Sequence, residues 1–288
     1  MDITALDRVT DRLMRSLAAG ETHAPAVLRF LQRRFAATAR DDLRDVLGPA
    51  IGAALEEEEE DNDLERLLTL SEAAGLSSDP ALVDVVRREA VRCRGAWPAR
   101  GAVAPAATAV ECCLVAARAL SEPAWTSDAL DELERIVGLA YEPGDGIAQQ
   151  LTTRVRIPGD LATHVAMSLA LLEAFDATGR LPYPMLAEEL MTHVERRPDA
   201  GPATRAESVE RIEKVGGLTS IASLDAARVW SRLARLQQDP DYRAVAVTRG
   251  DRDRHAERRL RGFDAEAESD PRLVAAYGLA LEAWLQVA

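Results

Sequence analysis

Apolar residues recur along the chain at the three- and four-residue spacing of helices, and two kinds of helical segment alternate. Residues 105–120 (PAATAVECCLVAARAL) are apolar on nearly every side, whereas residues 126–141 (TSDALDELERIVGLAY) carry only an apolar stripe. Residues 161–178 and 182–196 repeat this contrast. A helix that is apolar on two faces is buried between neighbours, and a helix with one apolar stripe lies on a surface. The pattern predicts hairpins made of one inner and one outer helix.

Three Asp-Pro dipeptides mark helix starts, at residues 79–80, 239–240 and 270–271. Asp accepts hydrogen bonds from backbone N–H groups as an N-cap, and Pro suits the first helical position, where no donor is required. Only residues 149–157 (QQLTTRVRI) alternate as a β-strand would. The fold class is all-α, with about eleven or twelve helices. They are expected at residues 3–18, 25–39, 42–55, 64–74, 81–94, 105–120, 126–141, 161–178, 182–196, 220–237, after 240, and at 271–287.

The inner helices are expected to begin near residues 64, 105, 161 and 220, at intervals of about 40 to 60 residues, which is the period of stacked helical hairpins. Regular solenoids have short, equal connections between their repeats, but here the connections at residues 141–160 and 198–219 are long and irregular. This difference favours an (α/α) toroid. An incomplete ring stays open as an alternative, with a homodimer that covers its free edge.

A single domain is expected over residues 1–288, in which 1–60 form N-terminal helices, with a separate subdomain as the alternative, and 61–288 form the hairpin repeats. The chain has 35 basic and 48 acidic residues, a net charge of −13. Such a surface repels phosphate backbones, so no nucleic acid partner is expected. Charged residues interrupt the apolar segments and the N-terminus, so neither a membrane span nor a signal peptide is expected. A cytoplasmic location follows as the expectation.

The three cysteines, Cys93, Cys112 and Cys113, fit small buried hydrophobic residues better than metal ligands, because no further Cys or His lies at ligand spacing. The chain contains no Gly-rich phosphate loop and no nucleophile elbow. We therefore expect no cofactor and no metal, and we find no complete catalytic set.

Residues 146–194 resemble the hairpin repeat of bacterial proteins in which a thioredoxin-like domain precedes a six-hairpin (α/α) toroid. LLEAFDATG at 171–179, followed by AEEL at 187–190, carries the resemblance, and ERIVGLAYEPGDGIA at 134–148 resembles the Gly-rich turn before it. That fold is shared with N-acylglucosamine 2-epimerases and several glycoside hydrolases. No Cys-x-x-Cys precedes the helices here, and the acidic residue expected after the Pro-Gly turn is shifted or lost. The resemblance implies the fold and leaves the activity open.

The loop at residues 141–160 is the predicted place for chemistry, because ligand sites favour the concave end of a helical ring. Sugar-processing sites combine an aromatic platform with carboxylates or histidine. The candidate catalytic residues are Glu142, Asp145, Asp160 and His164. The candidate ligand-binding residues are Tyr141, Gln149, Arg154, Arg156 and Trp125.

Each candidate also has a structural interpretation. Residues 142–146 form an ordinary turn sequence, and Asp160 precedes a helix as an N-cap would. His164 fits a hydrogen-bonded histidine in a helix interface. Arg154 and Arg156 either pair with nearby acids or hold an anion.

Two functions follow from these alternatives. The first is a scaffold or protein-interaction module without an evident complete catalytic set. The second is carbohydrate or other small-molecule binding or processing in an axial pocket. Whether the chain is an enzyme stays open.

Overall fold

The computed structural model describes residues 1–56, 63–77, 79–97, 101–151, 156–196, 209–246 and 252–287, with only the backbone at 209–220 and 245. This part contains thirteen helices and one two-stranded hairpin. The helices are α1 (Ile3–Ala18), α2 (Pro25–Thr38), α3 (Asp41–Glu56), α4 (Leu64–Leu76), α5 (Pro80–Gly95), α6 (Val103–Leu120), α7 (Pro123–Ala140), α8 (Leu161–Thr178), α9 (Pro182–Arg196), α10 (Val209–Leu236), α11 (Pro240–Val245), α12 (Arg252–Arg261) and α13 (Pro271–Leu285).

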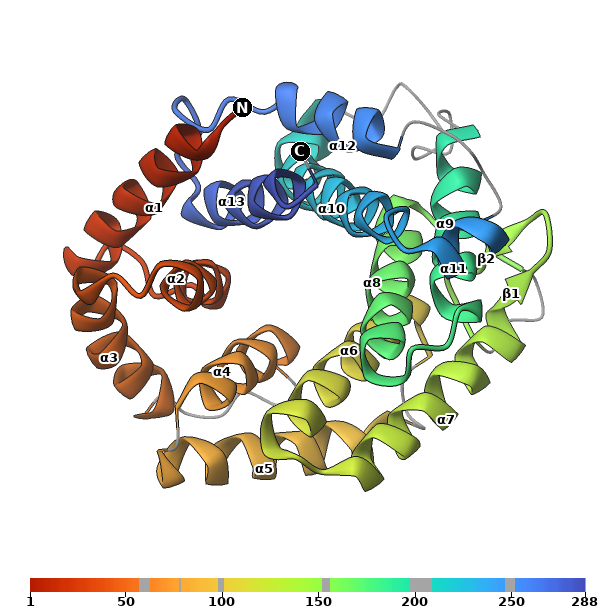
Figure 1. Cartoon of the computed structure of the whole chain (residues 1–288), viewed down its shortest axis with the longest axis horizontal. Coiled ribbons are helices and arrows are strands. Elements are labelled where there is room, and N and C mark those ends of the chain that lie inside the picture. Colours follow the sequence, from red (N-terminus) through yellow and green to blue (C-terminus); the bar gives the residue numbers. More distant parts are fainter. Residues whose placement is uncertain are drawn as a thin grey trace.

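The helices form two concentric layers around one axis (Figure 1). The inner layer consists of α2, α4, α6, α8, α10 and α13, each packed against the next, and α13 packs against α2. The outer layer consists of α1, α3, α5, α7, α9 and α12. The ring is therefore closed within one chain, and the fold is an (α/α) toroid of helical hairpins. The inner layer of the described residues therefore has no free edge.

The N-terminal helices are part of this ring. Helix α2 is an inner helix that lies between α4 and α13, and α1 and α3 cover it from outside (Figure 1). The first hairpin thus occupies the same kind of position as the later ones, although its sequence shows the inner and outer pattern less clearly.

The Asp-Pro pairs begin helices as predicted. Asp79, Asp239 and Asp270 each accept a hydrogen bond from a backbone N–H of the first turn, and the Pro that follows occupies the first helical position. These bonds satisfy donors that have no partner within the helix. The local sequence alone thus specifies where α5, α11 and α13 begin.

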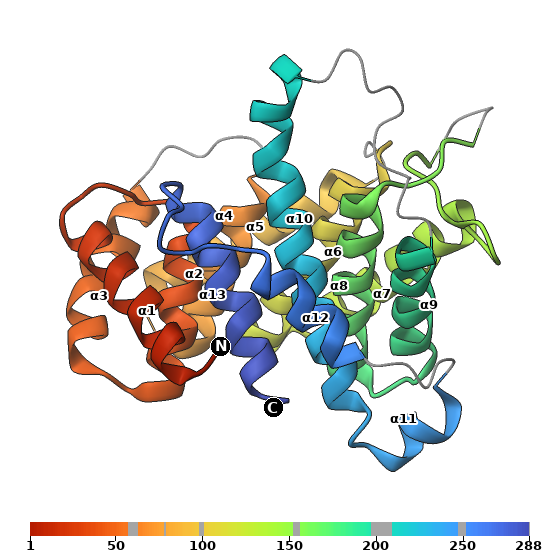
Figure 2. The same ribbon diagram turned by 90° about the horizontal axis from the view of Figure 1, so that it is seen from above.

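The structure differs from the prediction in the C-terminal third. Helix α10 begins at Val209 rather than near residue 220, and the segment after 240 forms two helices, α11 and α12. The Gly-Gly pair at 216–217 has low helix propensity, about 1 kcal/mol per glycine below alanine, which makes this stretch look like a break in the sequence. Figure 2 shows the N-terminal end of α10 extending beyond the other inner helices.

The contrast between inner and outer helices is confirmed in α6 and α7. Helix α6 is enclosed along most of its length, whereas α7 buries a stripe that includes Ala129, Leu133 and Ile136. Among the described residues, α6 alone has the length and apolar composition of a membrane span, contrary to the expectation that no segment would. Two thirds of it, 67%, is buried inside the ring, as expected for a core helix.

The loop between α7 and α8 contains the hairpin of β1 (Tyr141–Glu142) and β2 (Gly146–Ile147), paired antiparallel around the predicted turn. The strand predicted at 149–157 is not formed over its described residues, of which Gln150 alone makes an isolated bridge, to Ala102; residues 152–155 lie outside the described part. The hairpin contacts α7, α8 and α9 and lies at the outer side of the ring (Figure 1). This position differs from the axial funnel that the sequence predicts for the loop.

Candidate functional site

Two of the predicted ligand-binding residues, Tyr141 and Arg156, hold the hairpin in place. The Tyr141 hydroxyl donates a hydrogen bond to Glu189 on α9 at 2.7 Å. Burial, and then the Glu189 carboxylate, raise the pKa of Tyr141 to about 12. Arg156 donates to the carbonyls of Ala140 and Gly146, at 3.0 and 2.7 Å. Both side chains are thus used in holding the loop against the ring.

Asp160 and His164 fix the start of α8. Asp160 accepts hydrogen bonds from the backbone N–H and the hydroxyl of Thr163, at 2.9 and 2.7 Å, and is the predicted N-cap. His164 is only 1% exposed. Its Nδ1 lies 2.8 Å from the Asp160 carbonyl oxygen, and its Nε2 accepts from the Ile147 N–H at 3.4 Å. Burial lowers the pKa of His164. These contacts define a neutral imidazole with its proton on Nδ1.

The loop presses closely on this histidine. The rings of His164 and His193 stack with their centroids 5.4 Å apart. Gly146 has a φ of +69°, and a Cβ placed there would lie 2.7 Å from His164 Nε2. At Gly159 a Cβ would lie 2.5 Å from the Ile147 carbonyl oxygen. Only glycine fits at these two positions, so the sequence of the loop is adapted to cover the imidazole.

The remaining candidates are separated from this contact. Glu142 is exposed, with Arg156 3.6 Å away, and Asp145 is exposed in the turn. Gln149 exchanges backbone hydrogen bonds with Val103 and Ile157. Trp125, in the first turn of α7, lies under the Arg94 guanidinium, 5.3 Å from the ring centroid. Arg154 lies outside the described residues. The structure therefore gathers most of the predicted loop residues, but at the outer side of the ring.

A different set of charged side chains meets inside the ring, and we call it the axial cluster. Every inner helix contributes to it. The cluster comprises Arg29 and Arg33 on α2, Glu72 on α4, Glu111 and Arg118 on α6, Glu173 on α8, Asp225, Arg228 and Arg232 on α10, and Glu282 on α13.

Ion pairs that cross the ring locate the cluster. Glu111 on α6 lies 3.7 Å from Arg29 on α2 and 3.5 Å from Arg228 on α10. Neither α2 nor α10 is a neighbour of α6 in the inner ring, because α4 and α8 lie between them. Because Glu111 reaches past one intervening helix on each side, these side chains must lie near the axis. The centre of the ring is thus charged, rather than filled by Leu and Ala.

Two carboxylates of the cluster are firmly ionised. Glu72 lies 3.0 Å from Arg29 Nε and 2.7 Å from Arg33. Glu173 lies 3.0 Å from Arg118 and 2.9 Å from Arg232. Burial alone would raise their pKa values, but the paired guanidinium groups lower the pKa of each to about 2. These pairs link neighbouring inner helices to one another.

Glu111 behaves differently. Its burial raises its pKa, which Arg29 and Arg228 only partly oppose from their longer distances. Nearby Glu173 and Asp225 raise it further.

Two carboxylates lie at the end of the ring where the inner helices begin: Asp225, which belongs to the axial cluster, and Glu65, which does not. Glu65, in the first turn of α4, keeps part of its side chain exposed, while desolvation of its carboxyl and then the charge of Asp63 raise its pKa. Asp225 also acts on Glu65, and its side chain is 25% exposed beside Arg228 at 3.0 Å. Arg272, in the first turn of α13, opposes these acids. We call Glu65 and Asp225 the mouth carboxylates.

Sequence reasoning missed the axial cluster. The available signal was one charged residue inside an otherwise apolar inner helix, such as Glu111 in PAATAVECCLVAARAL and Glu173 in LALLEAF. Such a residue is costly to bury unless it has a partner. Among the described residues no three His, Cys, Asp or Glu side chains are placed to hold a metal ion.

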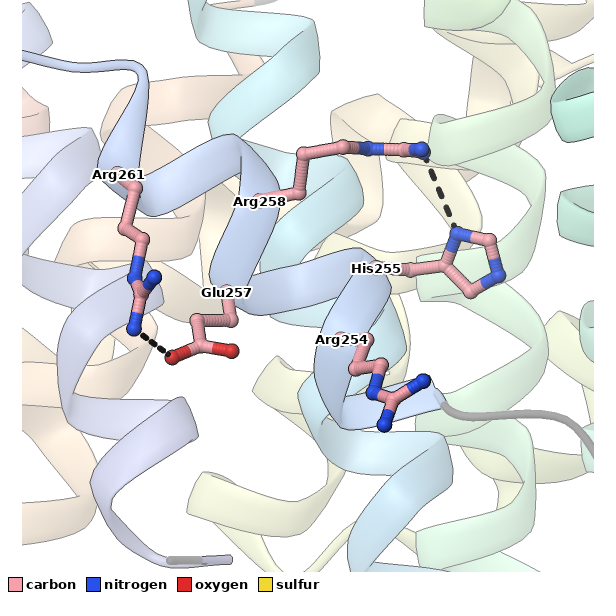
Figure 3. Close-up of a pocket in the computed structure, with 5 residues that line it drawn as sticks. All are labelled: Arg254, His255, Glu257, Arg258 and Arg261. Atoms are coloured by element: carbon pink, nitrogen blue, oxygen red, sulfur yellow. Dashed lines mark hydrogen bonds and ion pairs between the residues drawn. The ribbon is translucent and has the colours of Figure 1, made fainter.

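A surface depression of about 620 Å³ lies away from the axis, on the outer helix α12. Figure 3 shows its lining, Arg254, His255, Glu257, Arg258 and Arg261. The charges there are largely paired: Arg261 lies 2.6 Å from Glu257, and Arg258 lies 2.7 Å from Glu195 on α9. The pair between Arg258 and Glu195 links the outer helices α12 and α9 at this depression.

The closed double ring defines the class of protein, an (α/α) toroid of the kind found in six-hairpin glycosidases. Neither a protein-family model nor a curated protein matches the sequence.

Solved structures share the fold over almost the whole chain. An unsaturated glucuronyl hydrolase specific for heparin aligns with a TM-score of 0.68 at 11% identity, covering 99% of this chain and 98% of its own. The GH76A α-1,6-mannanase from Salegentibacter sp. HEL1_6 aligns with a TM-score of 0.64 at 12% identity, covering 98% and 100%. The Lin0763 protein from Listeria innocua aligns with a TM-score of 0.62 at 11% identity, covering 92% and 84%.

Proposed function

We propose that the chain binds a saccharide at the mouth of the ring, against Glu65 and Asp225. The observation that carries this proposal is the presence of two carboxylates, Glu65 and Asp225, at the mouth of a ring with a charged axis. Carboxylates hold sugar hydroxyl groups by charge-assisted hydrogen bonds. Because two glycosidases share the fold, a saccharide is the first class of small polar ligand to test.

A buried amide on α2 also supports a polar ligand. Gln32 lies one turn after Arg29 on α2 and is 2% exposed, yet neither atom of its amide has a hydrogen-bond partner. Buried amides normally have partners. A water molecule or a ligand hydroxyl inside the ring would satisfy Gln32.

Charge favours a neutral sugar over a uronate. Asp63, Glu65 and Asp225 place negative charge at the mouth, and Arg272 is held by Asp270 at 2.8 Å. An anionic sugar would meet repulsion from these carboxylates. The same arrangement suits hydrolysis: Glu65, with its raised pKa, is a candidate acid, and Asp225 supplies the second carboxylate.

Isothermal titration calorimetry of the full chain with α-1,6-mannotetraose and other neutral oligosaccharides tests the proposal. Binding should weaken at least about tenfold in the variants Glu65→Gln and Asp225→Asn, since each removes a charged acceptor. Glu257→Gln, on the outer helix α12, is the matched control and should bind as the unchanged chain does. If none of the neutral sugars binds, or if all three variants bind equally well, the mouth is not a saccharide site. Release of reducing sugar then distinguishes hydrolysis from binding alone.

The second candidate function is a scaffold, and one observation favours it. The charges of the axial cluster pair with one another across the closed ring, which suits a structural hub as well as the base of a pocket. Under this function, the substitutions Glu65→Gln and Asp225→Asn should leave the binding of every protein partner unchanged. Cross-linking followed by mass spectrometry would test it, and repeated recovery of this chain alone would argue against it.

A further inference from the structure

A second groove lies on the outside of the ring, between α5 and α7, and belongs to neither the mouth nor the axial cluster. It has a volume of about 580 Å³. Val91, Arg94 and Trp97 form the wall contributed by α5 and the residues after it. Asp128, Asp131, Glu132 and Arg135 form the wall contributed by α7.

Two hydrogen-bond donors on the α5 wall have no partner. Trp97 is 8% exposed, and its indole Nε1–H makes no hydrogen bond. Arg94 is tied to Asp128 through its terminal nitrogen, and its guanidinium covers the ring of Trp125, yet its Nε–H also makes no hydrogen bond. A buried donor without an acceptor costs free energy that an incoming acceptor would recover. Because both side chains are fixed by their packing, the donors are already oriented.

The opposite wall offers negative charge. Glu132 holds Arg135 through both oxygens, at 2.7 Å each, and Asp128 holds Arg94. Asp131 is exposed, and no ion pair to it is found among the described residues. Asp131 is therefore the carboxylate able to receive a cation from outside.

The space between the walls suits an extended chain. Val91 is 54% exposed and offers an apolar contact. Nothing lies within 4 Å of a Cβ placed on Gly95, so the backbone of α5 is open to close approach there. A saccharide fits less well, because it would stack on an aromatic face: Trp97 is buried, and Arg94 covers Trp125.

We propose that this groove binds an extended segment of a partner protein that carries Lys or Arg. Backbone carbonyls of the segment accept from Trp97 Nε1–H and Arg94 Nε–H, and its cationic side chain lies against Asp131. An aliphatic neighbour in the segment packs on Val91. The net charge of −13 on this chain attracts a basic partner over long distances as well.

The indole proton of Trp97 gives a direct test by NMR on the full ¹⁵N-labelled chain, with its signal assigned through Trp97→Phe. The probes are four pools of capped hexapeptides with Lys, Arg, Gln or Glu fixed at the third position and the other positions randomised. The Lys and Arg pools should shift the Trp97 indole signal downfield in a saturable way, at concentrations at least about tenfold lower than the Glu pool, because the cation meets Asp131.

Asp131→Asn should weaken the binding of the Lys and Arg pools at least about fivefold. It should leave the fold unchanged, since Asp131 is exposed. Asp84→Asn, an exposed acid of α5 outside the groove, is the matched control and should have no effect. No shift of the Trp97 signal with any pool, or equal binding by the Asp131→Asn variant, overturns the proposal. A shift produced by α-1,6-mannotetraose in place of the peptides would overturn it too and assign the groove to a saccharide.

Discussion

Arg29 on α2 and Glu111 on α6 lie 3.7 Å apart, although α4 separates their helices in the inner ring. Arg29 also holds Glu72 on that intervening helix at 3.0 Å. One guanidinium thus joins three of the inner helices. The stability of the toroid should therefore depend on the contacts of Arg29.

Glu72→Gln should destabilise the chain by about 3 kcal/mol, because it leaves the buried Arg29 without its closest counter-charge. Glu257→Gln removes a solvent-exposed pair with Arg261 and should cost less than about 1 kcal/mol. Urea unfolding of both variants measures the difference. Equal losses would show that the axial cluster contributes no more than a surface ion pair.

Stability should fall as the pH drops from about 5 toward 2. Glu72 and Glu173 have pKa values of about 2 in the fold, against an ordinary value of 4.5. Since the unfolded chain binds protons first in this range, their contribution is complete above pH 4.5 and is lost on acidification. The double variant Glu72→Gln, Glu173→Gln should show a shallower loss of unfolding free energy between pH 5 and 2. An unchanged slope would assign the acid sensitivity to other carboxylates.

A separate loss of stability is expected near neutral pH, from His164. Its pKa is lowered in the fold by burial, with His193 and Arg156 acting in the same direction and Asp160 opposing them. The unfolded chain therefore binds this proton first, and stability should decline as the pH falls below about 6.5. His164→Gln should flatten that part of the profile, while His23→Gln, at an exposed position, should not. The two variants giving the same profile would contradict this role.

Gly159→Ala should destabilise the loop over α8 by about 1 to 3 kcal/mol, because the added Cβ would lie 2.5 Å from the Ile147 carbonyl oxygen. Gly138→Ala provides the control, since it lies in α7 with no atom within 4 Å of the added Cβ. That substitution should be neutral or stabilising by up to about 1 kcal/mol. Thermal unfolding of the two variants, together with proteolysis of the loop, measures the effect; a stable Gly159→Ala variant would rule out the tight contact.

The features that sequence predicted best are those determined by neighbouring residues. Asp79, Asp160, Asp239 and Asp270 cap helices because the chemistry of a cap lies within three or four positions. The all-α class followed equally directly from the spacing of apolar residues. The turn at 142–146 was also evident from its glycines.

The axial cluster could not be predicted in this way, because its partners are far apart in sequence. Glu111 and Arg228 are 117 positions apart and meet only when the ring is complete. The loop at 141–160 shows the converse. Its local structure was largely predictable, but its position relative to the axis depends on how the Tyr141–Glu189 contact joins it to α9.

Closure of the ring also has a consequence for how the chain folds. Arg34 on α2 reaches Glu282 on α13, and Arg8 on α1 reaches Glu266 just before it, at 3.5 and 2.6 Å. These contacts join segments separated by most of the chain, so they form only after a large loss of loop entropy. An open array of hairpins can grow from any point, one repeat at a time. Here the first and last hairpins depend on each other, which favours slow, cooperative folding in which the final step brings the two ends together.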